Sequence, residues 1–164
     1  MTGAELHNPV TGHRYRCLHL EPGLLSMEVH YPAAATAPLE HYHPQQEERF
    51  QVLEGSLRVR IDGKERELVA GDLLTIPAGQ LHAMWTTESA ARVRWETRPA
   101  LGTWDFFAAT TRLAESGRLG ADGKPGMLDG ALLLHRFRRE MRVPRMPGAV
   151  ILVLSLLARM TGRR

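Results

Sequence analysis

Three histidines and one glutamate in this sequence have the residue types and the spacing of a metal site. His41 and His43 stand two residues apart, so on an extended strand both imidazoles point to the same side. Glu48 follows five residues later, and His82 comes much further along the chain. Imidazole and carboxylate groups together suit a borderline divalent ion. We therefore predict one divalent transition-metal ion (Fe, Mn, Ni, Cu or Zn) at His41, His43, Glu48 and His82.

Such a centre has more than one chemistry open to it. A six-coordinate ion held by four side chains keeps two positions for water, dioxygen or substrate. The ion can activate dioxygen, orient a bidentate substrate, act as a Lewis acid or lower the pKa of a bound water. Glu48 can also leave the ion and serve as a catalytic base. Each histidine alone is more readily interpreted as an ordinary polar residue, and only the combined spacing favours the metal site.

The elements that must position these side chains are short β-strands. Residues 57–61 alternate apolar residues with arginine, which is the period of a half-buried strand. Asp62-Gly63 follows, a dipeptide typical of two-residue hairpin turns, and residues 65–69 form the expected partner strand. Similar alternating runs, separated by turn residues, recur over residues 24–98. This pattern indicates an all-β sandwich or barrel.

The first group of candidate ligands also resembles a known motif. His41-x-His43, four residues, Glu48, six residues and Gly55 together resemble the first motif of the cupin superfamily. Glu47 precedes Glu48 and is the alternative carboxylate. We choose Glu48, because only Glu48 leaves six residues before Gly55 and because Phe50 and Val52 then share its inward face.

The last histidine belongs to a second resemblance. Gly71, five residues, Pro77-x-Gly79, two residues and His82 resemble the second cupin motif. The double match implies a double-stranded β-helix, or jelly-roll barrel, with the metal inside its mouth and the same four side chains as ligands. We expect C-terminal α-helices to follow the jelly-roll barrel.

Two positions depart from the family pattern, and three others are expected to line the substrate pocket. Ala35 stands where the first motif usually has glycine, and Thr86 stands where the second usually has asparagine. Neither position is a metal ligand in the family. Alternation from His82 places Met84 and Thr86 on the metal's side. We expect Phe50, Met84 and Thr86 to line the cavity, and plain core packing is the alternative for all three.

The sequence divides into two parts. Residues 1–100 form the expected barrel, and residues 101–164 form a helical extension that packs on the barrel or on a dimer partner. Helices are expected over 103–116, 129–142 and 147–160. The last contains the apolar run 149–158, which is shorter than the ~20 residues needed to span a bilayer. Because this helix is apolar all round, we expect it to be buried, with a shallow membrane anchor as the alternative.

Charge and cysteine content limit the remaining possibilities. Cys17 is the single cysteine, so no intrachain disulfide forms. The formal charge is +3, and residues 131–164 hold eight arginines against the single acid Glu140. Such a basic end suits nucleic acid, an acidic partner or a membrane surface, but a solvated helix face is favoured. We expect a cytoplasmic homodimer with no nucleic-acid partner and no transmembrane span.

Three functions remain open for such a metal-binding cupin. The first is a mononuclear metal-dependent dioxygenase-like oxidoreductase that acts on a small organic molecule. The second is a non-oxidative isomerase, lyase or cyclase that uses the same site. The third is a binding or sensing module without turnover. The family resemblance implies no choice among them, because one fold hosts many functions.

Overall fold

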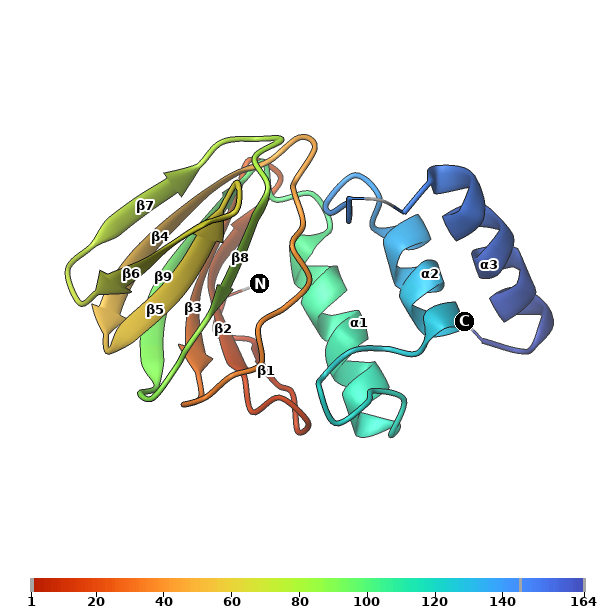
Figure 1. Ribbon diagram of the computed structural model, residues 1–164, viewed down its shortest axis with the longest axis horizontal. Coiled ribbons are helices and arrows are strands. Elements are labelled where there is room, and N and C mark those ends of the chain that lie inside the picture. Colours follow the sequence, from red (N-terminus) through yellow and green to blue (C-terminus); the bar gives the residue numbers. More distant parts are fainter. Residues whose placement is uncertain (1, 145, 164) are drawn as a thin grey trace.

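The computed structural model describes residues 2–144 and 146–163 and consists of two antiparallel β-sheets followed by three helices (Figure 1). The strands are β1 (Glu5–His7), β2 (Arg14–Glu21), β3 (Leu24–Tyr31), β4 (Glu47–Glu54), β5 (Ser56–Ile61), β6 (Lys64–Val69), β7 (Leu73–Ile76), β8 (His82–Trp85) and β9 (Ala91–Arg98).

The two sheets form a sandwich rather than one closed, hydrogen-bonded barrel. The larger sheet has the strand order β1-β2-β3-β9-β4-β7, and the smaller sheet has the order β6-β5-β8. Apolar side chains from both sheets meet in one buried core, which includes Val29 and Val93 from the larger sheet and Leu57 and Val59 from the smaller. The antiparallel sheets and the three C-terminal helices agree with the expected fold, but the described strands do not close into a barrel and the molecule is mostly β rather than all-β.

The hairpin predicted from alternation is present. Leu57 and Val59 of β5 are fully buried, whereas Arg58 and Arg60, which alternate with them, are only partly buried and lie on the outer face. Asp62 and Gly63 both have positive φ, at 48° and 79°, and connect β5 to β6. Both central residues of a type I′ turn need this conformation, which explains the Asp-Gly dipeptide.

Gly55, between β4 and β5, is a position that only glycine fits. Its φ is 73°, and a Cβ there would overlap the carbonyl oxygen of Ala90. Two chain segments therefore approach each other closely at the residue that ends the first sequence motif. This close contact lies at the turn from β4 into β5, at the end of β4 opposite to the two histidines.

The three helices lie progressively further from the sheets (Figure 1). Helix α1 (Thr103–Glu115) rests on the larger sheet, where Phe107 stacks on Tyr15 at 4.5 Å between ring centroids. Helix α2 (Met127–Arg136) contacts α1 through a small apolar cluster that includes Ala109 and Leu133. Helix α3 (Gly148–Met160) packs mainly on α2.

Helix α3 differs from its sequence expectation. It was expected to be buried on the barrel or across a dimer, but within this chain only Ser155 and Ala158 are buried, and they face α2. The large apolar side chains on its other side are exposed: Val150, Leu152, Val153, Leu156, Leu157 and Met160. Within this chain, α3 packs mainly on α2 rather than on the barrel, and packing across a dimer stays a prediction. Among the described residues, no helix is long and apolar enough to cross a membrane.

Candidate metal centre

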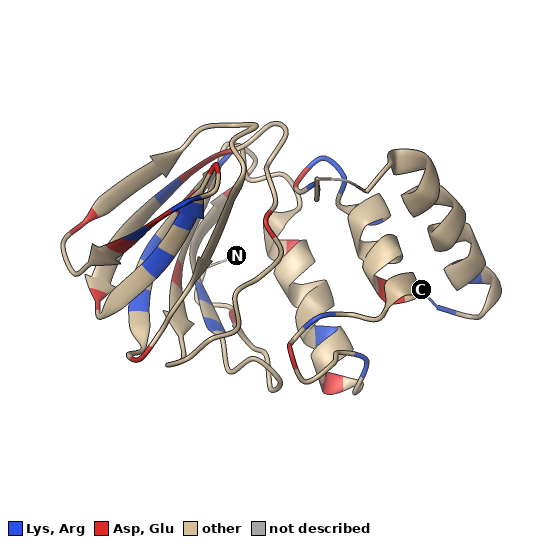
Figure 2. Ribbon diagram, viewed as in Figure 1, with Lys and Arg blue, Asp and Glu red and all other residues tan. Residues whose placement is uncertain are grey.

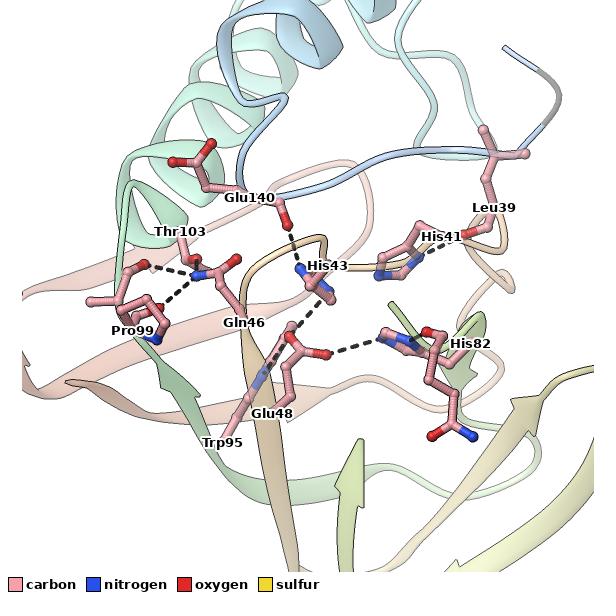
Figure 3. A network of polar contacts seen from close by, with 12 residues as sticks. Leu39, His41, His43, Gln46, Glu48, His82, Trp95, Pro99, Thr103 and Glu140 are labelled. Carbon is pink, nitrogen blue, oxygen red and sulfur yellow. Dashed lines mark hydrogen bonds and ion pairs between the residues drawn. The ribbon is translucent and has the colours of Figure 1, made fainter. Parts of the chain in front are cut away.

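The candidate site lies where the two sheets approach each other (Figure 3). His41 and His43 belong to the segment just before β4, Glu48 is the second residue of β4, and His82 is the first residue of β8. His41 and His82 pair through two backbone hydrogen bonds of 3.0 and 2.9 Å, in an isolated antiparallel bridge. This bridge sets the two imidazoles side by side although 41 positions separate the residues.

The structure brings the three predicted histidines together. Potential ligand atoms of His41, His43 and His82 all lie within 4.8 Å of one another. The ring centroids are 4.6 Å apart for His41 and His82, and 5.3 Å apart for His43 and His82. This cluster is compatible with one metal ion.

Glu48 stands beside two of these histidines. Its Oε1 atom lies 3.2 Å from Nε2 of His43, and its Oε2 atom lies 3.0 Å from Nε2 of His82. Glu48 is fully buried, whereas Glu47 forms an exposed ion pair with Arg49 at 2.8 Å. The inward carboxylate is thus the one chosen from the sequence.

Backbone carbonyls fix the orientation of all three imidazoles. Nδ1 lies 2.8 Å from the Leu39 oxygen in His41, and 2.9 Å from the Gln80 oxygen in His82. In His43, Nδ1 lies 2.6 Å from the Glu140 oxygen. Because a carbonyl oxygen only accepts, each Nδ1 carries the hydrogen and each Nε2 presents a lone pair. Metal-ligating histidines typically donate their other ring N–H in this way.

The polar atoms left at the centre fit a cation. Nε2 of His43, Nε2 of His82 and Oε2 of Glu48 are buried and have no hydrogen-bond partner. Where neither a proton nor a metal ion lies between them, these close contacts bring the lone pairs of the imidazoles and the carboxylate together. Buried groups of this kind need a partner, and a metal ion supplies one for all of them at once.

The pKa shifts of Glu48 and His43 reflect the attraction between the buried carboxylate and positive charge. Burial, followed by the neighbouring His82 and His43, lowers the pKa of His41 to about 3. Burial by itself raises the pKa of Glu48, but the contacts with His43 and His82 outweigh it and lower that pKa to about 2. Burial also lowers the pKa of His43, but the Glu48 charge outweighs this effect, so the pKa is raised. At neutral pH, Glu48 is ionised and His41 is neutral, which are the forms that bind a metal.

The helical extension contributes directly to this site through Glu140. Its backbone oxygen accepts the hydrogen bond from His43, while its side-chain Oε1 accepts a 2.9 Å hydrogen bond from the Gly102 N–H, just before α1. Nearby, Tyr42 and Arg142 pair through two backbone hydrogen bonds. This pairing accounts for the early end of α2, which was expected to reach residue 142. The chain after Arg136 leaves the helix and lies along the segment that carries His41 and His43.

A buried glutamine secures the other side of the same segment. Gln46 is fully buried, and its Nε2 donates to the Pro99 oxygen at 2.8 Å, the Ala100 oxygen at 3.0 Å and the Thr103 hydroxyl at 2.8 Å. These bonds tie the residues between the histidines and β4 to the start of α1.

Trp95 holds the carboxylate. Its indole N–H donates to Oε1 of Glu48 at 3.1 Å. Sequence reasoning missed Trp95, Gln46 and Glu140. The β9 alternation was the only sequence signal for Trp95, which lies on an inward-facing position of that strand.

The two departures from the family pattern meet in the structure. The Ala35 N–H donates to the Thr86 hydroxyl oxygen at 3.2 Å, and that hydroxyl donates to the Pro32 carbonyl. The side chain at position 86 therefore holds the loop that contains position 35. Ala35 and Thr86, which replace the glycine and asparagine of the family pattern, therefore bond to each other and hold the loop around residues 32–35.

The predicted pocket residues are all buried. Phe50 and Met84 belong to the core between the sheets, and Phe50 contacts Trp95 at 5.0 Å between ring centroids. Through Trp95, Phe50 is one contact away from Glu48. Thr86 lies at the far end of the β8 region from His82, and its hydroxyl is engaged in the loop contacts just described.

Comparisons with known proteins agree with this geometry. Residues 27–97 match the family model of the cupin domain, so this part of the chain carries the cupin domain that its motifs predicted. No curated protein matches the chain.

Several solved structures share the fold. KdgF from Halomonas sp. is 22% identical, with a TM-score of 0.53 over 57% of this chain and 84% of that chain. An RmlC-like cupin from Shewanella frigidimarina is 21% identical, with a TM-score of 0.55 over 61% and 87%. TT1209 from Thermus thermophilus is 23% identical, with a TM-score of 0.51 over 57% and 88%. At these identities the likeness concerns the fold alone.

Proposed function

We propose that this protein is a metal-dependent cupin enzyme, dioxygenase-like in its chemistry, that acts on a small organic molecule. The supporting observation is that three backbone carbonyls hold the Nδ1–H groups of His41, His43 and His82 while their other nitrogens converge. We propose these histidines and Glu48 as the ligands of one divalent ion. When bound, such an ion supplies dioxygen activation and Lewis-acid polarisation of the substrate.

The two oxygens of Glu48 have different surroundings and, in this proposal, different roles. Oε1 accepts the Trp95 N–H, which fixes the carboxylate in the site. Oε2 has no hydrogen-bond partner and faces His82 at 3.0 Å. When Glu48 leaves the ion, we assign Oε2 as the atom that accepts a proton from the substrate, because Oε1 already accepts the Trp95 N–H.

The buried side chains next to the centre supply its walls. Phe50 and Met84 give an apolar surface that suits an organic or aromatic substrate and excludes water. Thr86 contributes by holding the loop around residues 32–35. We also propose that the substrate is a small molecule and that the protein forms a homodimer.

A second candidate is a non-oxidative isomerase, lyase or cyclase. The unpartnered Oε2 atom of Glu48 favours it, because proton transfer at a substrate carbon needs a buried base and no oxidant. Oxygen consumption separates the two candidates. Turnover that requires oxygen supports the first, and turnover under strict anaerobiosis supports the second.

The experiment that tests the metal site is elemental analysis of the purified protein and of His82→Ala. His30→Ala serves as the matched control, because His30 is exposed and lies outside the cluster. We expect about one ion per chain in the parent and the control, and a loss of at least about tenfold in affinity in His82→Ala. Equal metal content in all three proteins would contradict the site. Iron, manganese, nickel or copper favours oxidative chemistry, and zinc favours the second candidate.

A further inference from the structure

Positive charge is concentrated in a groove between the helices, away from the metal centre. The groove has a volume of about 850 Å³ and lies between α1, α2 and the C-terminal end of α3. Among the described residues, one acid, Asp129, lines it. Its arginines are Arg112, Arg118, Arg136, Arg138, Arg159 and Arg163. Six arginines against one aspartate exceed the formal charge of +3 of the whole chain, so the remainder of the molecule is slightly negative.

The single acid in the groove is already neutralised. Asp129 is buried, and its carboxylate accepts hydrogen bonds from two nitrogens of Arg118, one of them at 3.1 Å. Arg163 approaches the same carboxylate at 3.3 Å. In the part of the chain that the structure describes, no carboxylate pairs with the other four, Arg112, Arg136, Arg138 and Arg159. Figure 2 shows the same imbalance on α3, which carries no acidic residue.

Part of the groove's lining is apolar. Leu113 of α1 and Leu132 and Leu133 of α2 line it together with the arginines. Its volume falls within the range of small-ligand sites, ~300–1,000 Å³. Clustered like charges repel one another, and a bound anion relieves this repulsion. The combination of several cations and a partly apolar lining suits a ligand that has an anionic head and an organic body.

We propose that this groove binds the phosphate group of an amphipathic organic phosphate. A guanidinium group matches phosphate with two parallel hydrogen bonds, and a phosphate dianion engages more than one arginine at a time. The organic body lies against the three leucines. The phosphate comes either from a free metabolite or from a lipid headgroup, and the exposed apolar side of α3, next to Arg159, faces the membrane in the second case.

The test uses the full chain and four probes: hexyl phosphate, phosphatidylglycerol vesicles, phosphatidylcholine vesicles and a short single-stranded oligonucleotide. The test variant combines Arg136→Gln with Arg159→Gln. The matched control combines Arg14→Gln with Arg66→Gln, which removes the same charge from exposed strand positions. Circular dichroism confirms that both variants fold, and metal content is expected to be unchanged in both.

We expect calorimetry or vesicle sedimentation to show binding of hexyl phosphate or of phosphatidylglycerol vesicles, but not of phosphatidylcholine vesicles. The groove variant is expected to bind at least about tenfold more weakly, because each charge-assisted hydrogen bond contributes strongly, while the control stays within about twofold. Hexyl phosphate binding identifies a free phosphate, and binding of the anionic vesicles alone identifies a headgroup. Three results overturn the proposal: neither phosphate probe binds, both variants weaken equally, or the oligonucleotide binds more tightly than either phosphate.

Discussion

The β-sandwich and the outer helices differ in how completely they bury their apolar side chains. In the sandwich, Leu57, Val59 and Val93 are completely shielded from solvent by the opposite sheet. On α3, Val153 is 56% exposed and Met160 is 83% exposed. The sandwich therefore completes its own core, whereas α3 retains an apolar side that this chain does not cover. The apolar side chains of α3 stay exposed because, among the described elements, α3 has only α2 beside it, whereas each sheet of the sandwich covers the apolar face of the other.

The two regions nevertheless meet at one functional point. Glu140 follows α2, and its backbone oxygen accepts the hydrogen bond from His43, a residue of the candidate metal centre. The helical region is thus linked to the candidate site although most of it lies elsewhere.

The largest effect that separates the two regions is expected from truncating a core side chain. Phe50→Ala removes a fully buried ring between the sheets and is expected to lower the free energy of unfolding by about 3–5 kcal/mol. Denaturant unfolding of the apo protein measures this. A loss below about 1 kcal/mol would show that the sandwich core repacks freely, and the contrast with α3 would fail.

An intermediate effect is expected at the link between the regions. Glu140→Ala removes the acceptor of the Gly102 N–H and so loosens the segment whose carbonyl holds His43. We expect metal affinity to fall about 10–100-fold, the usual range for outer partners of a ligand. Competition with a chelator measures this affinity.

The conservative variant makes this prediction specific. Glu140→Gln keeps an oxygen that accepts from Gly102 and is expected to restore most of the affinity. Glu115→Ala is the matched control, an exposed glutamate at the far end of α1. Equal affinity in the alanine and parent proteins would show that the extension does not position His43.

The smallest effect is expected on the outer side of α3. Leu156 is 50% exposed, so Leu156→Gln is expected to change the free energy of unfolding by less than about 0.5 kcal/mol. The measurement is denaturant unfolding at several protein concentrations, together with sedimentation velocity. A larger loss that grows with concentration would show that a second copy covers this side.

The strands over residues 24–98 and most of the candidate site were predictable from local patterns, whereas β1 and β2 were not predicted. Alternation identified β5 and the inward face of β4, and the Asp62-Gly63 dipeptide identified the hairpin. The choice of Glu48 over Glu47 followed from the motif spacing to Gly55 and from the same two-residue period. These features depend on neighbours in the sequence, which is why the sequence revealed them.

The missed features depend on contacts between distant segments. The Glu140 contact with His43 spans 97 positions and uses a backbone oxygen, which every residue has, so no residue type marks it. The open arrangement of the two sheets, in place of a closed barrel, depends on strand pairing between segments far apart in the sequence. The end of α2 at Arg136 was missed because the following chain pairs with Tyr42 rather than continuing the helix.

The position of Glu140 also affects how the protein matures during synthesis. The ribosome has assembled every candidate metal ligand once His82 is added, yet the oxygen that orients the His43 ring is added 58 residues later. A growing chain therefore exposes the His43 ring before the carbonyl that orients it exists, whereas the carbonyls of Leu39 and Gln80 that orient His41 and His82 are already present. Only the synthesis of Glu140 completes the set of three carbonyls.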